Sequence, residues 1–161
     1  MNLGPILYAE DEENDVFFLK RAFQQAELCH PLVIATDGQE AINYCAGRGR
    51  YSNRAEFPQP CLVLLDLNMP KKSGLEVLQW IRQEPSVCTL PVIVLTSSLQ
   101  NADIHRAYVH GANAYLAKPS RPEEMVVMVK AIKDFWITQN QAAEKGWEFS
   151  GNKLRKDGLA P

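Results

Sequence analysis

The sequence lacks any apolar run that approaches the ~18 consecutive residues needed to cross a membrane. Its first residues also lack the basic segment and long apolar core of a signal peptide, so we expect a cytoplasmic protein without a membrane partner. An excess of one charge is missing too, because 17 basic and 19 acidic residues leave a net charge of −2. Such a balance gives no electrostatic footprint for nucleic acid, which we therefore do not expect as a partner.

Cysteine and histidine are sparse and carry no metal-binding spacing. The four cysteines lie far apart without a CxxC pair, and the three histidines show no regular ligand spacing. Isolated cysteines of an intracellular protein are usually reduced and fill the core or its margin. We therefore expect neither a disulfide framework nor a zinc site.

The hydrophobic residues, 46% of the 161, are enough for one core and recur with two periods. Short apolar runs typical of strands are followed by stretches with helical spacing; the runs span residues 5–9, 32–35, 61–65, 91–95 and 114–117. This alternation predicts an α/β fold, a doubly wound five-stranded parallel sheet in the flavodoxin-like order 2-1-3-4-5. Another α/β topology with the same element order is the alternative.

Several local signals mark where the helices begin. Three of them fit the capping box, in which Glu follows a capping residue at the third position: Asp37 with Glu40, Ser73 with Glu76, and Ser120 with Glu123. The fourth helix is expected from about Asn101 to Gly111. Residues 47–60 are polar and rich in turn-forming types, which predicts an extended surface loop.

Polar side chains stand at the carboxyl ends of four predicted strands: Glu10 and Asp11, Asp66, Thr96, and Lys118. In the order 2-1-3-4-5 these strands are neighbours, so the side chains converge at one edge of the sheet. Three carboxylates at one place repel one another unless a cation lies among them, and oxygen ligands suit Mg²⁺. A lysine and a hydroxyl beside them indicate a site for forming an aspartyl phosphate. Taken alone, Asp66 could equally cap a turn.

Four segments in this order resemble the response-regulator receiver domain: ILYAEDEEND, LVLLDLNMPKKSGLEVL, PVIVLTSS and GANAYLAKP. The resemblance extends over about residues 5–136 and implies a receiver domain at residues 1–137. It implies that Asp66 is the phosphoacceptor and that Lys118 pairs with the phosphoryl group. It also implies that Mg²⁺ is bound by Asp11, Asp66 and the main-chain oxygen of Asn68, with Glu10 reaching the ion through water.

The same resemblance implies a switch built from Thr96 and Tyr115. Thr96 would move to donate a hydrogen bond to the phosphoryl group, and Tyr115 would turn into the vacated space. Asn68 and Ser98 would tune the hydrolysis of the aspartyl phosphate. A cis peptide bond is implied between Lys118 and Pro119.

As a receiver, the chain is expected to take its phosphoryl group from a sensor histidine kinase. It would not be an enzyme in the ordinary sense, although it would assist its own phosphorylation and slow dephosphorylation. The insertion at residues 47–60, the motif NMPKKSG and the run Asp134-Phe135-Trp136 resemble stand-alone regulators that pair with phytochrome-type kinases. An ordinary core role would explain the two aromatic residues equally well.

No effector domain is expected, so the signal would pass through protein contacts. The resemblance implies a homodimer through the face of the fourth helix, fifth strand and last helix, and possible transfer of phosphate to a downstream phosphotransfer protein. Residues 138–161 are predicted to be a C-terminal extension, partly flexible or associated with dimerisation. Trp147 and Phe149 could fold back on the last helix or contact a second subunit.

Three other readings compete with a phosphorylated receiver. A phosphatase of the haloacid dehalogenase type would need an acid two residues after its nucleophile, where this chain has Asn68. A degenerate receiver would act only as a binding module, which the complete set of acidic residues and lysine disfavours. A DNA-binding regulator would need a helix-turn-helix, which the sequence does not show.

Overall fold

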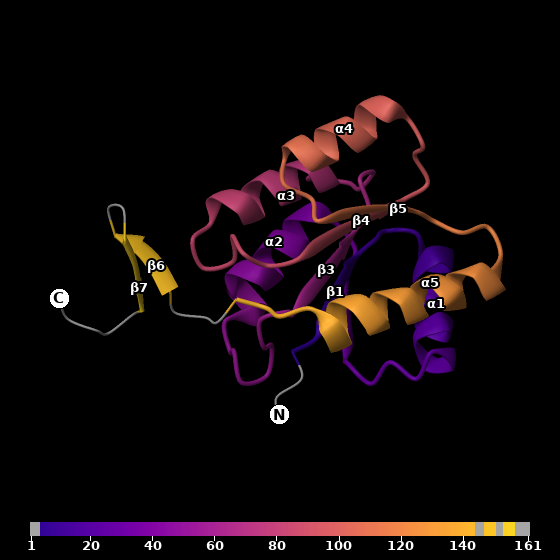
Figure 1. Cartoon of the computed structure of the whole chain (residues 1–161), viewed down its shortest axis with the longest axis horizontal. Coiled ribbons are helices and arrows are strands. Elements are labelled where there is room, and N and C mark those ends of the chain that lie inside the picture. Colours follow the sequence, from indigo (N-terminus) through magenta and orange to yellow (C-terminus); the bar gives the residue numbers. More distant parts are fainter. Residues whose placement is uncertain (1–3, 144–146, 151–152, 157–161) are drawn as a thin grey trace.

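The computed structural model describes residues 4–143, 147–150 and 153–156. Its main feature is a sheet of parallel strands in the order β2-β1-β3-β4-β5 (Figure 1). The strands are β1 (Ile6–Ala9), β2 (Leu32–Ala35), β3 (Leu62–Leu65), β4 (Val92–Thr96) and β5 (Ala114–Ala117). The predicted fold class and strand order are therefore confirmed.

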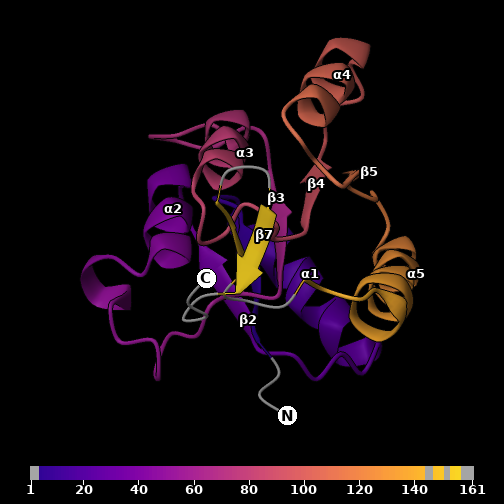
Figure 2. The same cartoon turned by 60° about the vertical axis from the view of Figure 1, so that its left-hand side comes forward.

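Helices cover both faces of this sheet, as the crossovers of a doubly wound fold require. They are α1 (Glu13–Gln25), α2 (Gly38–Ala46), α3 (Gly74–Gln83), α4 (Asn101–Val109) and α5 (Pro122–Ile132), and α5 continues into the π-helix η2 (Lys133–Gln139). Helices α1 and α5 lie together on one face, α2 and α3 lie on the other, and α4 lies near β5 (Figures 1 and 2). No helix of the described ranges combines the length and apolar character needed to cross a membrane.

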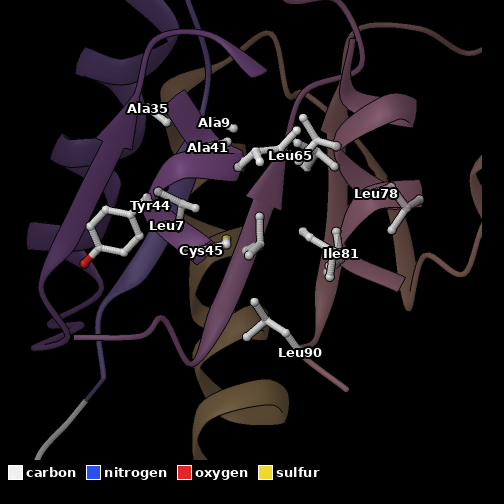
Figure 3. Packing of buried hydrophobic residues seen from close by; sticks show 14 of the residues in the cluster. Leu7, Ala9, Ala35, Ala41, Tyr44, Cys45, Leu65, Leu78, Ile81 and Leu90 are labelled. Carbon is white, nitrogen blue, oxygen red and sulfur yellow. The ribbon is translucent and has the colours of Figure 1, made fainter. Parts of the chain in front are cut away.

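The core has two halves because successive strand residues point to opposite faces. Leu7 and Leu65 pack with α2 and α3, where Leu78 and Ile81 are fully buried (Figure 3). The residues that alternate with them, such as Tyr8 and Leu64, pack against α1 and α5. A strand buried on both faces needs apolar residues at every position, which explains the continuous runs that mark β1, β3 and β4.

The predicted capping boxes have different outcomes. Ser73 and Glu76 form the complete box at the start of α3. At α2, Asp37 accepts a hydrogen bond from the N–H of Glu40 at 2.8 Å, but the Glu40 carboxylate accepts from Thr36 instead of the capping residue. Only half of that box is present.

The predicted box of Ser120 and Glu123 is wrong. Helix α5 begins at Pro122, and its N-cap residue is Arg121, whose side chain makes no capping hydrogen bond. Proline favours the first helical position because its fixed φ suits a helix and its missing N–H needs no partner there. Proline also pushes the preceding residue into an extended conformation, which moves the start of the helix past Ser120.

Residues 47–60 are compact, in contrast to the predicted extended surface loop. They contain a 3₁₀ turn, η1 (Gly49–Tyr51), whose Tyr51 is buried. The Tyr51 ring packs edge-to-face on Tyr44 and Phe57, with centroids 5.0 and 5.2 Å apart. Arg54 donates to main-chain oxygens of Tyr44 and Cys45 at the end of α2. The segment thus carries a small aromatic cluster of its own.

The C-terminal extension contains two short antiparallel strands, β6 (Trp147–Ser150) and β7 (Lys153–Lys156). The sequence did not predict this hairpin. The side chains of Trp147 and Phe149 lie outside the part of the chain that the structure describes. Their predicted packing, the dimer association of residues 138–161 and the domain boundary at residue 137 therefore stay predictions.

Candidate functional site

The register of the sheet places the predicted site residues at one edge. Ala9 pairs with Leu65, and Thr96 pairs with Ala117, so the residues that follow β1, β3 and β5 leave the sheet side by side. The N–H of Asp66 donates to the oxygen of Ala9 at 3.1 Å, and the N–H of Lys118 donates to the oxygen of Thr96 at 2.9 Å. The expected convergence at the carboxyl edge is therefore observed.

Lys118 is the centre of this cluster. Its Nζ lies 3.1 Å from Oδ2 of Asp66 and 2.7 Å from Oδ2 of Asp15, and it also donates to Oε2 of Glu10. The lysine side chain is only 7% exposed, so these ion pairs are largely shielded from water. A buried ammonium surrounded by carboxylates provides a fixed positive charge next to Asp66.

Burial and the charged or hydrogen-bonding partners act in opposite directions on the pKa of each of the two groups described next. Glu10 is fully buried, and the loss of hydration raises the pKa of its carboxyl although hydrogen bonds from Lys118 and from the N–H of Glu12 oppose the shift. For Lys118, burial acts to lower the pKa, but hydrogen bonds to Asp15 and Glu10 and the charge of Asp66 outweigh it and raise the pKa. The lysine therefore stays charged throughout the physiological range.

Oxygen atoms suited to a hard cation meet at the same place. Glu10, Asp11 and Asp66 each offer a carboxylate oxygen, and these atoms lie within 4.8 Å of one another. Asp11 is exposed whereas Glu10 and Asp66 are buried, so the group opens toward solvent on the Asp11 side. An all-oxygen set that is open to water fits Mg²⁺ or Mn²⁺. Asn68 lies in the loop two residues beyond Asp66, and its side chain is exposed.

Thr96 and Tyr115 lie close to this cluster without joining it. Thr96 is fully buried at the end of β4, and its Oγ1 accepts from the N–H of Ser98 at 3.5 Å. The Tyr115 hydroxyl donates to the main-chain oxygen of Ser98 at 2.9 Å, which holds the β4–α4 loop. The Ser98 hydroxyl donates to Oδ2 of Asp103 at 2.6 Å, so Ser98 is engaged with α4.

The predicted cis peptide bond between Lys118 and Pro119 is wrong, because this bond is trans in the structure. Trans is the preferred form of an X–Pro bond, by ~0.5–1 kcal/mol. The trans chain still brings the Lys118 side chain to Asp66 and Glu10.

Sequence reasoning missed two side chains of the cluster, Asp15 and Tyr8. Asp15 lies in the first turn of α1 and pairs with Lys118. Tyr8 is fully buried within β1, and its hydroxyl donates to Oε2 of Glu10 at 3.0 Å. An acidic residue within one helical turn of an acidic strand end was an available signal for Asp15. No sequence signal pointed to Tyr8, because a tyrosine in an apolar run is typical of the hydrophobic core.

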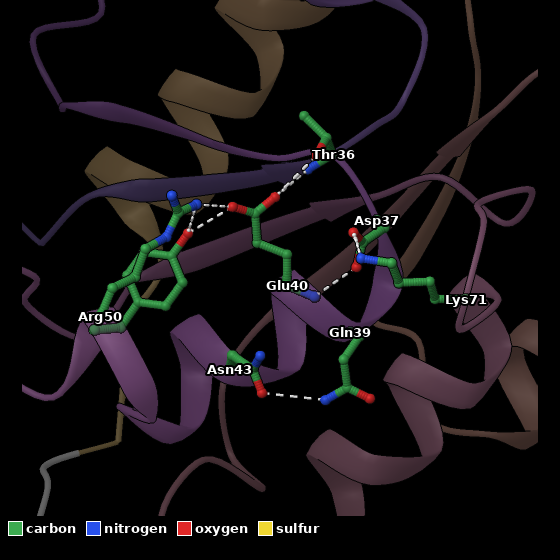
Figure 4. Close-up of polar contacts among 8 residues, drawn as sticks. Thr36, Asp37, Gln39, Glu40, Asn43, Arg50 and Lys71 are labelled. Atoms are coloured by element: carbon green, nitrogen blue, oxygen red, sulfur yellow. Dashed lines mark hydrogen bonds and ion pairs between the residues drawn. The ribbon is translucent and has the colours of Figure 1, made fainter.

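A second set of polar side chains holds the loop that follows Asp66 (Figure 4). Lys71, in the β3–α3 loop, pairs with Oδ2 of Asp37 at 2.8 Å. Burial acts to raise the pKa of the Asp37 carboxyl, but hydrogen bonds from Lys71 and from the N–H of Glu40 outweigh it and lower the pKa. Beside this pair, Glu40 accepts hydrogen bonds from Arg50, Tyr51 and Thr36. The loop is thereby fixed to the start of α2.

Comparison with known proteins identifies the family of this chain. The family model of the response regulator receiver domain matches residues 6–130. Response regulator Rcp1 of Synechocystis sp. (strain ATCC 27184 / PCC 6803 / Kazusa) is 37% identical over 132 residues, which cover 82% of this chain and 88% of Rcp1.

Two solved structures are similar along most of the chain. The crystal structure of the Mn(2+)-bound form of response regulator Rcp1 is 35% identical with a TM-score of 0.78, and the match covers 88% of this chain and 99% of that one. The crystal structure of the phosphorylated cyanobacterial phytochrome response regulator RcpA is 33% identical with a TM-score of 0.81, with the same coverage. The chain therefore belongs to the response regulator receiver domain family and is related to phytochrome response regulators.

Proposed function

We propose that this chain is a two-component response regulator that accepts a phosphoryl group on Asp66 from a histidine of a sensor kinase. The observation that carries the proposal is the 3.1 Å contact between Lys118 Nζ and Asp66 Oδ2 inside a buried acidic cluster. Asp66 has a carboxylate oxygen to attack phosphorus, and Lys118 has a positive charge to balance the charge that arrives.

We assign Mg²⁺ as the metal of this site. Asp11, Asp66 and the main-chain oxygen of Asn68 would hold it, and Glu10 would contact it through water. When bound, the ion neutralises charge on the phosphoryl oxygens and relieves the repulsion among the carboxylates. The carboxylate oxygens within 4.8 Å of one another support this assignment, as does the Mn²⁺ that the related Rcp1 structure contains.

In the transfer, one oxygen of Asp66 forms a bond to phosphorus while the bond between phosphorus and the kinase imidazole nitrogen breaks. The electron pair of that bond stays on the imidazole. Lys118 pairs with a phosphoryl oxygen and offsets its charge. The protein is thus the substrate of the kinase and assists its own modification, which is why we do not class it as an enzyme.

The modified Asp66 would act on the protein surface through Thr96 and Tyr115. Thr96 is buried beside the site, and a phosphoryl oxygen offers its hydroxyl a charged acceptor. Tyr115 holds the β4–α4 loop through the main-chain oxygen of Ser98, so movement of that loop would release the ring. A change of this kind biases two arrangements of α4 and β5.

We assign a phytochrome-type histidine kinase as the phosphodonor. The support is the similarity along most of the chain to RcpA, which is a phosphorylated cyanobacterial phytochrome response regulator. Transfer onward to a downstream phosphotransfer protein is consistent with the same chemistry, because an aspartyl phosphate remains a reactive donor.

A homodimer through the α4–β5–α5 face is the proposed assembly. Large apolar side chains are exposed there: Tyr108 and Val109 on α4, and Val127 on α5, at 51%, 66% and 68% exposure. Exposed apolar side chains on such a face are available to a protein contact. Size-exclusion chromatography with light scattering should show a dimer in the presence of beryllofluoride. A monomer with and without beryllofluoride would contradict the assembly.

The function is tested by phosphotransfer from a panel of histidine kinases to the wild type and to Asp66→Asn. Wild type should be labelled and Asp66→Asn should not. Asp134→Asn is the matched control, since it removes an exposed carboxylate of η2 far along the chain from the site. Equal labelling of wild type and Asp66→Asn would defeat the assignment. A wild type that no kinase and no acetyl phosphate labels would favour a binding module that works without phosphorylation.

A further inference from the structure

One carboxylate that holds Lys118 comes from a helix instead of the sheet edge. Asp15 lies in the first turn of α1, and its Oδ2 is 2.7 Å from Lys118 Nζ. The same nitrogen lies 3.1 Å from Oδ2 of Asp66. A residue of α1 therefore shares the lysine with the proposed phosphoacceptor.

Local hydrogen bonding directs Asp15 toward this contact. In a capping box, a Glu or Gln at the third helical position accepts a hydrogen bond from the N–H of the N-cap residue. Asp15 occupies this position in α1. In α1 the N-cap residue is Glu12, and Oε1 of Glu10 accepts from its N–H at 3.0 Å. The strand end thus does the capping, and the Asp15 carboxylate pairs with Lys118.

The number of N–H donors limits how many partners Lys118 can hold at once. A lysine ammonium has three N–H donors. Among the described residues, Lys118 makes three ion pairs, with Glu10, Asp15 and Asp66. Its donors are therefore fully used before any phosphoryl group is present, and a phosphoryl oxygen on Asp66 has to displace one of them.

Asp15 is the partner that water can replace most easily. Its side chain is 34% exposed, whereas those of Glu10 and Asp66 are 0% and 7% exposed. Removing the ion-pair partner of a buried carboxylate strongly destabilises the protein, whereas water can hydrate an exposed carboxylate that loses its partner. The negative charge of Asp15 also opposes a phosphoryl dianion nearby.

We propose that Asp15 is a positioning residue that holds Lys118 in the unphosphorylated protein and competes with the phosphoryl group for it. The inference rests on the proposed function of Asp66. On phosphorylation, Lys118 exchanges Asp15 for a phosphoryl oxygen, and the Asp15 carboxylate turns to water. The pair thereby favours the unphosphorylated state and sets how readily the site accepts a phosphoryl group.

The test measures the affinity of Asp15→Asn for beryllofluoride with Mg²⁺, by titration of backbone amide NMR signals. Asparagine keeps the size of the side chain but removes its charge. We expect binding about five-fold tighter than in the control, the size of a partly exposed ion pair. The control is Glu13→Gln, which removes one exposed charge from the same turn without touching Lys118. Asp15→Glu keeps the charge and should stay near the wild type.

A second readout needs no metal and no phosphoryl analogue. Reductive methylation of Lys118, followed by mass spectrometry, should be faster in Asp15→Asn than in Glu13→Gln, because two carboxylates instead of three hold the amine. Equal methylation rates, or beryllofluoride affinity that is unchanged or weaker in Asp15→Asn, would overturn the role of Asp15. A wild type that binds no beryllofluoride would instead defeat the proposed function itself.

Discussion

The hydroxyl of Tyr8 donates a hydrogen bond of 3.0 Å to Oε2 of Glu10, and both residues are completely buried. The same oxygen accepts from Lys118, so one carboxylate oxygen joins the core of the protein to the proposed phosphorylation site. Burial, the charge of Glu10 and this hydrogen bond all raise the pKa of Tyr8. The tyrosine therefore acts as a donor at any physiological pH.

Replacing Tyr8 with phenylalanine removes this donor and leaves the ring in place. We expect Tyr8→Phe to lower the free energy of unfolding by about 1 kcal/mol, the usual worth of a buried hydrogen bond. Urea unfolding measures the change. Tyr115→Phe is the control, because it removes a hydrogen bond of 2.9 Å at a more exposed site and should cost less. A larger loss of unfolding free energy in Tyr115→Phe than in Tyr8→Phe would contradict the proposed contribution of the Tyr8 hydrogen bond.

Gly74, the first residue of α3, has no room for a side chain. An added Cβ would lie 2.1 Å from the main-chain oxygen of Asp66 and 2.8 Å from Cα of Leu67. Gly74→Ala must therefore shift the backbone that carries Asp66. We expect a loss of at least ~1–3 kcal/mol in the free energy of unfolding, together with slower labelling by acetyl phosphate.

Gly49→Ala separates this steric effect from the conformational preference of glycine. Gly49 has a φ of +61° but nothing within 4 Å of its added Cβ. Its substitution should cost only the ~1 kcal/mol of a left-handed backbone and leave the labelling rate unchanged. Equal labelling in Gly74→Ala and wild type would show that the loop tolerates the shift.

The residues that sequence reasoning placed correctly are those fixed by sheet order. Asp66 and Lys118 lie 52 positions apart, yet once the order 2-1-3-4-5 was inferred their meeting followed from the geometry of parallel strands. Continuous apolar runs indicated a parallel sheet buried on both faces, and the order was inferred because it is a common doubly wound arrangement. The family resemblance supported the same arrangement independently.

The features that could not be predicted depend on side-chain direction and on competition between local signals. Asp15 was missed because the sequence does not show where an acid at a helix start points, and only the structure shows that Glu10 accepts from the N-cap N–H. Ser120 and Glu123 matched a capping pattern, but Pro122 dominated the start of α5. Tyr51 lies in a polar stretch, where composition gave no sign of an aromatic cluster.

The ion pair of Asp37 with Lys71 should make stability depend on pH. The folded-state pKa of Asp37 lies below its ordinary value of 3.8, because Lys71 and the N–H of Glu40 stabilise the charged form more than burial opposes it. A carboxyl group whose pKa is lowered by folding stabilises the protein at pH values above its unfolded-state pKa. This contribution is lost as the pH falls through the folded-state pKa. Its loss should therefore occur below about pH 3.8.

Asp37→Asn tests this dependence, because asparagine can still cap α2 but cannot pair with Lys71. The variant should be less stable than wild type at pH 7, and the difference should shrink as the pH falls below 4 in urea unfolding curves. Lys71→Gln should behave in the same way. A difference that stays constant from pH 7 to pH 3 would show that the capping geometry, and not the charge, accounts for the effect.

Magnesium should stabilise the folded protein, because the oxygens of Glu10, Asp11 and Asp66 lie close together only after folding. At a Mg²⁺ concentration of 100 times the dissociation constant, linkage predicts a gain of about 2.7 kcal/mol. Thermal unfolding with Mg²⁺ or with a chelator measures this gain.

Asp11→Asn should fold, since Asp11 is exposed, but should lose most of the gain. Glu56→Gln removes an exposed acid from the 47–60 segment and should keep the gain in full. If Asp11→Asn responded to Mg²⁺ as strongly as Glu56→Gln, the ion would be stabilising the protein from some other position than this carboxylate group.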